Sequence, residues 1–151
     1  MQIDPFMQQE LPIIFYADDD TDDLSLFKEA AGSLDIDVSV SAFSLADEML
    51  DVMRNPPPNP AVVFIDLNMP VKSGYDLIKE IRESEGFQQV PIVVLFTASD
   101  HRSVTKSREL GANYFITKPT DINKLVSAIR HTLSIDWKKF NPTYGEFIHK
   151  H

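Results

Sequence analysis

The sequence predicts an α/β fold, a doubly wound parallel sheet of five strands with five helices. Short continuous apolar runs recur along the 151-residue chain, and such runs are typical of strands that are buried on both faces. Between them lie segments whose apolar side chains recur every three or four positions, which is the spacing of one helix face. Regular alternation of these two kinds of segment predicts parallel strands with helices on both faces of the sheet.

The first half of the chain contains three expected strands. Residues 13–17 are apolar, and an acidic run follows them before an amphipathic helix. A short strand is expected at residues 38–42, followed by a helix that ends at Met53. The proline cluster behind that helix is too short to link two domains, so we interpret it as a rigid loop. The third strand, residues 62–65, leads directly into Asp66.

The second half contains the remaining two strands. A helix is expected from Gly74, followed by a strand at residues 92–96. The helix expected at residues 101–110 is mostly polar, which predicts a weakly buried face. A short strand at residues 114–116 comes next. The last helix carries a regular apolar stripe, formed by Ile122, Leu125, Val126, Ile129 and Leu133.

The domain organisation follows from these elements. We expect one domain at residues 12–135, an N-terminal arm at residues 1–11 and an aromatic C-terminal tail at residues 136–151. The stretch after residue 135 is too short for a DNA-binding or catalytic output domain. A stand-alone domain is therefore the expectation.

Composition excludes several classes of function. The chain has no cysteine, which removes disulfides, thiolate zinc sites and cysteine nucleophiles. Its formal charge of -9 repels phosphate backbones, so we expect no direct nucleic-acid binding. We find neither a signal-peptide pattern nor an apolar run long enough to span a bilayer. These features predict a cytoplasmic protein without membrane contact.

Polar side chains follow four of the expected strands at the point where each strand ends. Asp18 and Asp19 follow the first strand, Asp66 the third, Thr97 the fourth and Lys118 the fifth. In open α/β sheets the ligand crevice lies outside these carboxyl ends. A single aspartate there is either a cap for the next turn or a working carboxylate. The coincidence at four strand ends favours a working site.

Electrostatics indicates what such a site needs. Two carboxylates about 5 Å apart repel by roughly 3 kcal/mol at an effective dielectric constant near 20. Three of them require a cation to stay ionised, and oxygen ligands suit Mg²⁺ or Mn²⁺. With a lysine and a threonine to hold phosphoryl oxygens, Asp66 is a candidate nucleophile toward a phosphoryl group.

These motifs resemble the receiver domain of response regulators in two-component signalling, which has a flavodoxin-like fold. The resemblance covers residues 11–135 and depends on the acidic pair, the Asp-Leu-Asn-Met-Pro motif at Asp66, Thr97-Ala98 and Lys118-Pro119. It implies that Asp66 accepts a phosphoryl group from a sensor histidine kinase or a histidine phosphotransfer protein. No separate substrate is turned over, so the protein is not expected to be an enzyme in the usual sense.

The resemblance also implies roles for the surrounding residues. Asp19 and Asp66 would bind Mg²⁺ directly, Asp18 would assist through water, and the backbone carbonyl of Asn68 would complete the protein ligands. Lys118 would pair with the phosphoryl group.

The family resemblance further implies a switch. Thr97 would turn inward to meet the phosphoryl oxygen, and the aromatic residue at position 115 would follow it. That residue is Phe115, where the family often has tyrosine. The Lys118–Pro119 peptide is a cis candidate. The signal would leave by protein contact or phosphorelay through the helix at 101–110, the fifth strand and the last helix.

Three other interpretations fit the residues less well. Asp18, Asp20, Asp22 and Glu29 match calcium-loop positions, but Asp23 replaces the required glycine and a strand precedes the run. Phosphatases of the haloacid-dehalogenase type also form a phosphoaspartate with Mg²⁺, but they need an Asp-x-Asp-x-Thr pattern that the acidic run lacks. A phosphorylation-independent interaction module on the same fold is disfavoured by the complete set of site residues. Asp20, Asp22 and Asp23 are expected to form a mostly solvated helix start.

The tail carries aromatic residues at helical spacing, interrupted by Pro142. One interpretation is that they pack back on the domain. The other is that they form a homodimer or partner surface, because aromatic residues are enriched at interfaces. The residues concerned are Trp137, Phe140, Tyr144 and Phe147.

Overall fold

The structure, a computed structural model that describes residues 11–151, contains the predicted five-stranded parallel sheet. The strand order is β2-β1-β3-β4-β5, so the sheet extends from β1 to β2 on one side and to β3, β4 and β5 on the other. The strands are β1 (Ile13–Ala17), β2 (Ser39–Phe43), β3 (Val62–Ile65), β4 (Ile92–Phe96) and β5 (Tyr114–Thr117). The arm expected at residues 1–11 lies, except for Leu11, outside the described residues.

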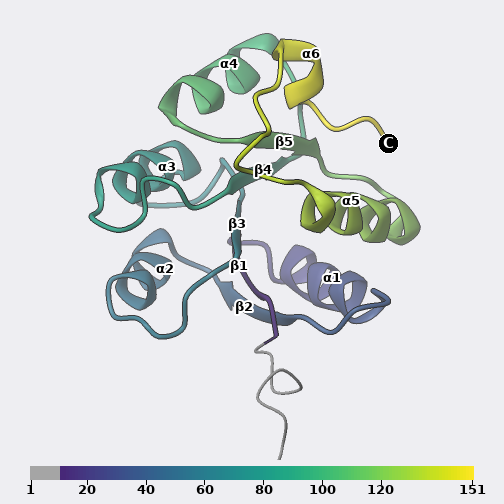
Figure 1. Ribbon diagram of the computed structural model, residues 1–151, viewed down its shortest axis with the longest axis horizontal. Coiled ribbons are helices and arrows are strands. Elements are labelled where there is room, and N and C mark those ends of the chain that lie inside the picture. The colour runs from purple at the N-terminus through teal and green to yellow at the C-terminus, as the bar shows by residue number, and fades with distance from the viewer. Residues whose placement is uncertain (1–10) are drawn as a thin grey trace, which may run out of the picture.

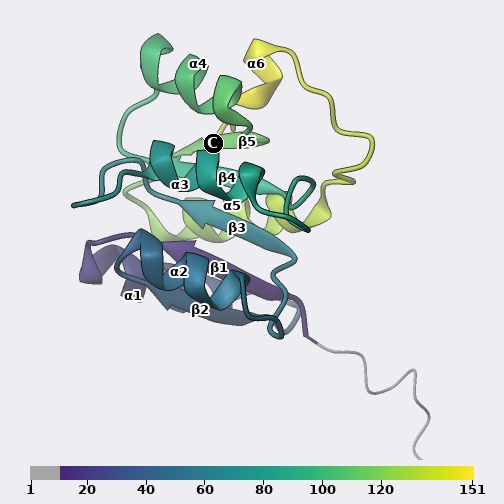
Figure 2. The same ribbon diagram turned by 90° about the vertical axis from the view of Figure 1, so that its left-hand side faces the viewer.

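Helices cover both faces of the sheet, as predicted (Figure 1). One face is covered by α1 (Thr21–Gly32) and α5 (Ile122–Ser134), and the other by α2 (Ala46–Met53), α3 (Gly74–Glu83) and α4 (His101–Leu110). Figure 2 shows α2 and α3 in front of the sheet, with α4 beyond its β5 end. None of the helices in residues 11–151 has the length and hydrophobicity needed to cross a bilayer.

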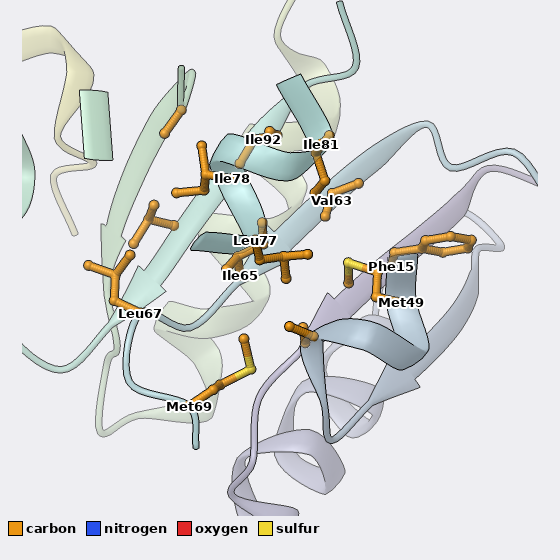
Figure 3. Packing of buried hydrophobic residues seen from close by; sticks show 14 of the residues in the cluster. Phe15, Met49, Val63, Ile65, Leu67, Met69, Leu77, Ile78, Ile81 and Ile92 are labelled. Carbon is orange, nitrogen blue, oxygen red and sulfur yellow. The ribbon is translucent and has the colours of Figure 1, made fainter. Parts of the chain in front are cut away.

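The sheet separates two hydrophobic cores because successive strand residues point to opposite faces. Val63 and Ile65 of β3 belong to the core under α2, α3 and α4, where they lie with Leu77 (Figure 3). Val62 and Phe64 belong to the core under α1 and α5. All residues of β3 are buried, which explains the continuous apolar run that predicted this strand.

The hydrogen-bond ladder of the sheet extends beyond the strands and fixes the residues that follow them. The backbone N–H of Asp66 donates to the carbonyl of Ala17 at 2.9 Å. The N–H of Asp18 donates to Phe43 at 3.0 Å, and that of Lys118 donates to Phe96 at 2.7 Å. The backbones of Asp18, Asp66 and Lys118 are therefore fixed at the same edge of the sheet, although these residues are far apart in the sequence.

One further helix appears in the tail. It is α6 (Tyr144–Phe147), a single turn capped by the side chain of Thr143. Figure 1 shows α6 beside α4 and β5, on the edge of the sheet opposite β2. The prediction of five helices is therefore correct for the domain and omitted this turn.

Candidate functional site

Three carboxylates meet at the carboxyl edge of the sheet, as the sequence predicted. Asp18, Asp19 and Asp66 each offer a carboxylate oxygen, and these atoms lie within 4.8 Å of one another. Asp18 and Asp66 are buried and Asp19 is exposed. A purely oxygen donor set with one side open to solvent fits a hard divalent cation that keeps some of its water, such as Mg²⁺ or Mn²⁺.

Asp18 is held by donors from three directions. Its Oδ2 accepts from the hydroxyl of Tyr16 and, at 2.8 Å, from Nζ of Lys118. Its Oδ1 accepts from the backbone N–H of Asp20 at 3.0 Å. Burial, and next the charge of Asp18, raise the pKa of Tyr16, so this phenol stays protonated as a donor. The arrangement fixes the Asp18 carboxylate and leaves Asp19 the more accessible of the pair.

The carboxylate of Asp66 has weaker contacts with hydrogen-bond donors and positive charge than that of Asp18. Burial is the main reason, and the charge of Asp18 the second, that its pKa rises to about 7; Lys118 acts in the opposite direction. Its Oδ1 accepts a long hydrogen bond of 3.5 Å from the N–H of Asn68. Its Oδ2 lies 3.7 Å from Nζ of Lys118. A cation at the acidic cluster would supply the missing positive charge.

Lys118 reaches the cluster as predicted, but an additional aspartate holds it. Its Nζ lies 2.7 Å from Oδ2 of Asp23 in the first turn of α1. Burial by itself would lower the pKa of Lys118, but its hydrogen bonds to Asp18 and Asp23 outweigh burial and raise it to about 12. The lysine is therefore charged. The expectation that Asp23 is merely part of a solvated helix start is wrong.

The structure corrects one detail at this lysine and leaves two roles as predictions. The Lys118–Pro119 peptide is trans, so the cis expectation is wrong. The trans form is favoured by about 0.5–1 kcal/mol for such bonds, and from it the lysine already reaches the carboxylates. Thr97 is exposed just beyond β4, and an inward turn of this residue is not seen. Metal coordination by the Asn68 carbonyl stays a prediction.

Three of the four aromatic side chains of the tail, those of Trp137, Phe140 and Phe147, pack back on the domain as the first interpretation predicted, whereas Tyr144 is exposed. Phe147 is only 1% exposed and belongs to the core under α4, with its ring centroid 6.4 Å from that of Phe115. Trp137 and Phe140 pack around Tyr114 on the opposite side of β5. Because Phe147 is buried, it cannot serve as a free interface residue in this conformation.

The tail also pairs with β5 through its backbone. Ile148 forms a parallel bridge with Phe115, and the N–H of His149 donates to the Phe115 carbonyl at 2.8 Å. Arg108 of α4 donates to the carbonyl of Pro142 at 2.7 Å. The tail thus occupies the open edge of β5, next to the expected switch residue Phe115.

Comparison with known protein families identifies the family of this chain. The model of the response regulator receiver domain family matches residues 14–130, which is well over half of the chain. The chain belongs to the response regulator receiver domain family. A five-stranded sheet of order 2-1-3-4-5 and an acidic pocket at its carboxyl edge are the features that define the class here.

Individual relatives agree with this family. The response regulator Rcp1 of Synechocystis sp. is 32% identical over 73 residues, which cover 48% of this chain and 50% of Rcp1. The rice two-component response regulator ORR7 is 31% identical over 91 residues, covering 58% of this chain and 43% of that protein. The chain thus matches about half the length of these curated relatives.

Solved structures confirm the fold. The phosphorylated cyanobacterial phytochrome response regulator RcpA superposes with a TM-score of 0.75 at 23% identity, covering 88% of this chain and 98% of RcpA. The Mn²⁺-bound form of Rcp1 gives a TM-score of 0.72 at 23% identity, covering 87% of this chain and 99% of Rcp1. Rcp1 is therefore a protein of this fold that binds Mn²⁺.

Proposed function

We propose that this protein is a response regulator whose Asp66 accepts a phosphoryl group from a sensor histidine kinase or a histidine phosphotransfer protein. The observation that carries the proposal is the meeting of Asp18, Asp19 and Asp66, with the ammonium of Lys118 3.7 Å from Asp66. The site thus combines a nucleophilic carboxylate, a donor set for a hard cation and a fixed positive charge. Membership of the receiver family supports the same role.

The residues divide the chemistry of the transfer. An Asp66 oxygen forms the new bond to phosphorus, while the bond from phosphorus to the donor's imidazole nitrogen breaks and the imidazole leaves. Asp18, Asp19 and Asp66 would hold a divalent cation, which would supply positive charge for the phosphoryl oxygens. Lys118 would donate to one of these oxygens, and Thr97, which follows β4, would donate to another after a turn inward.

Transfer from a small phosphodonor tests this role. Wild-type protein incubated with the donor and Mg²⁺ should gain the mass of one phosphoryl group, because the cation offsets the repulsion between the incoming group and the carboxylates. Addition of EDTA before the donor should prevent the mass increase. Equal modification with and without EDTA would contradict the metal-dependent mechanism.

We further propose that the signal leaves through α4, β5 and α5 by protein contact or phosphorelay. Phe115 is the proposed link between the phosphoacceptor site and this surface. It lies on β5, is fully buried and contacts the tail. Movement of Thr97 and Phe115 on phosphorylation would change the surface around them. A partner affinity that is unchanged by phosphorylation would contradict this route.

The packing of the tail against the domain predicts that the tail contributes to the stability of the fold. We expect Phe147→Ala to lower the free energy of unfolding by about 3 kcal/mol, because a fully buried phenyl ring is removed from the core. Tyr144→Ala is the matched control; its side chain is 37% exposed, so a loss below about 1 kcal/mol is expected. Urea unfolding of both variants measures the difference.

The alternative of a tail-mediated homodimer predicts a different result. With Phe147 buried in its own domain, we expect monomer mass in solution both for the whole chain and after deletion of residues 136–151. Light scattering coupled to size exclusion measures this. A dimer mass that falls to monomer on deletion would instead establish the tail as the dimer surface.

A further inference from the structure

The ammonium of Lys118 is shared among three carboxylates, and the nearest is not the phosphoacceptor. Its Nζ lies 2.7 Å from Asp23, 2.8 Å from Asp18 and 3.7 Å from Asp66. An ammonium has three N–H donors, and two of them are engaged by Asp18 and Asp23. The distance to Asp66 exceeds that of a hydrogen bond. Lys118 is therefore held beside the phosphoacceptor without a bond to it.

Local structure explains why Asp23 reaches the lysine. Asp20 caps α1 and accepts from the N–H groups of Asp22 and Asp23 at 2.9 and 3.2 Å, which fixes the first turn of the helix. Asp23 also lines a small cavity of about 20 Å³ together with Lys118, Phe27 and other apolar residues. The ion pair therefore lies against an apolar wall, which strengthens it relative to a pair in open solvent.

The two partners of the lysine differ in how readily they can release it. The side chain of Asp18 is 0% exposed and is also held by Tyr16 and the N–H of Asp20. The side chain of Asp23 is 32% exposed, so water can replace the ammonium there. A carboxylate that stays solvated after losing its partner suffers a smaller desolvation penalty. Asp23 is accordingly the partner that gives up Lys118 when a new anion arrives.

We propose that Asp23 is a positioning residue that holds Lys118 away from Asp66 in the unphosphorylated protein and opposes its transfer to the phosphoryl group. This inference rests on the proposed function of Asp66. Once a phosphoryl group is attached to Asp66, its oxygens compete with Asp23 for the ammonium of Lys118. Asp23 thereby destabilises the phosphorylated protein relative to the unphosphorylated protein.

The test is the affinity for beryllofluoride, a phosphoryl mimic, in the presence of Mg²⁺, measured by calorimetry. Asp23→Asn should bind it about fivefold more tightly than wild type, since the charged competitor for Lys118 is gone. Asp22→Asn is the matched control. It removes the same charge from the same helical turn, and Asp22 makes no ion pair with Lys118. If both variants gain the same affinity for beryllofluoride, the loss of one negative charge near the site explains the effect, and the proposal is overturned.

A double-mutant cycle shows whether Asp23 acts through the lysine. In a Lys118→Ala background, Asp23→Asn should add no affinity beyond that of Asp22→Asn. A gain of the same size in that background would overturn the proposal.

Nitrogen NMR of the Lys118 ammonium, without beryllofluoride, provides a readout that is independent of binding. Its signal should shift in Asp23→Asn and stay in place in Asp22→Asn. If the signal does not move in Asp23→Asn while the wild-type protein binds beryllofluoride, the role of Asp23 is overturned and the proposed function stays intact. A wild-type protein that binds no beryllofluoride with Mg²⁺ would overturn both.

Discussion

Replacing Asp66 with asparagine should stabilise the metal-free protein at neutral and alkaline pH. The pKa of Asp66 is about 7 in the folded protein, against an ordinary value of 3.8, because the group is buried beside Asp18. The folded state therefore prefers the protonated form. The contribution of Asp66 to the stability of the fold is therefore least unfavourable below pH 3.8, falls as pH rises toward 7 and stays low above that. The full difference is on the order of 4 kcal/mol, at about 1.4 kcal/mol per pKa unit.

Urea unfolding in EDTA at pH 5.5 and pH 8 measures this effect away from the isoelectric region. The stability of Asp66→Asn relative to wild type should increase by about 2 kcal/mol between these pH values, because the remaining shift of the pKa lies in this window. Saturating Mg²⁺ should reduce the difference, since the cation compensates the ionised carboxylate. If the difference in unfolding free energy between Asp66→Asn and wild type is the same at both pH values, the pKa of Asp66 is not raised by burial and the charge of Asp18.

Substitution of Gly74 by alanine should damage both the fold and the site. Gly74 begins α3, and its N–H donates to the carbonyl of Leu67 at 3.0 Å. A Cβ atom at this position would lie 2.2 Å from the backbone oxygen of Asp66 and 2.6 Å from Cα of Leu67. Backbone atoms cannot rotate away, so either α3 or the phosphoacceptor segment must move. We expect a loss of about 3 kcal/mol in the free energy of unfolding.

Function should fall with it, because a displacement of about 1 Å at a reacting group can lower the rate by about a hundredfold. The rate of phosphorylation by a small donor with Mg²⁺ measures this, at a temperature where the variant is folded. Gly32→Ala is the control, since a Cβ at Gly32 meets no atom within 4 Å. A Gly74→Ala protein with wild-type stability and rate would show that α3 does not hold Asp66 in place.

The sequence alone was sufficient for the sheet and for the main residues at its edge. Strand β3 is buried on both faces, so its composition carried an unambiguous signal. Asp66 and Lys118 could be placed because parallel strands bring their carboxyl ends to one edge. The short helix α6 was missed, because a single turn leaves no periodic pattern to detect.

Two residues of the site escaped prediction for different reasons. Tyr16 belongs to an apolar run and looks like an ordinary core residue, yet side chains two positions apart in a strand share a face, so its hydroxyl meets Asp18. Asp23 is one of several acidic residues at a helix start. The orientation of α1 against β5 decides which of them faces Lys118, and this orientation is a property of tertiary packing.

The most direct test of the phosphoacceptor assignment is the intact mass of wild type and Asp66→Ala after incubation with a small phosphodonor and Mg²⁺. We predict one phosphoryl adduct on wild type and none on the variant, with the same fold in both proteins by circular dichroism. An adduct of equal yield on Asp66→Ala would place the phosphoacceptor elsewhere. The absence of any adduct on wild type would contradict phosphoacceptor function and favour a phosphorylation-independent interaction module on this fold.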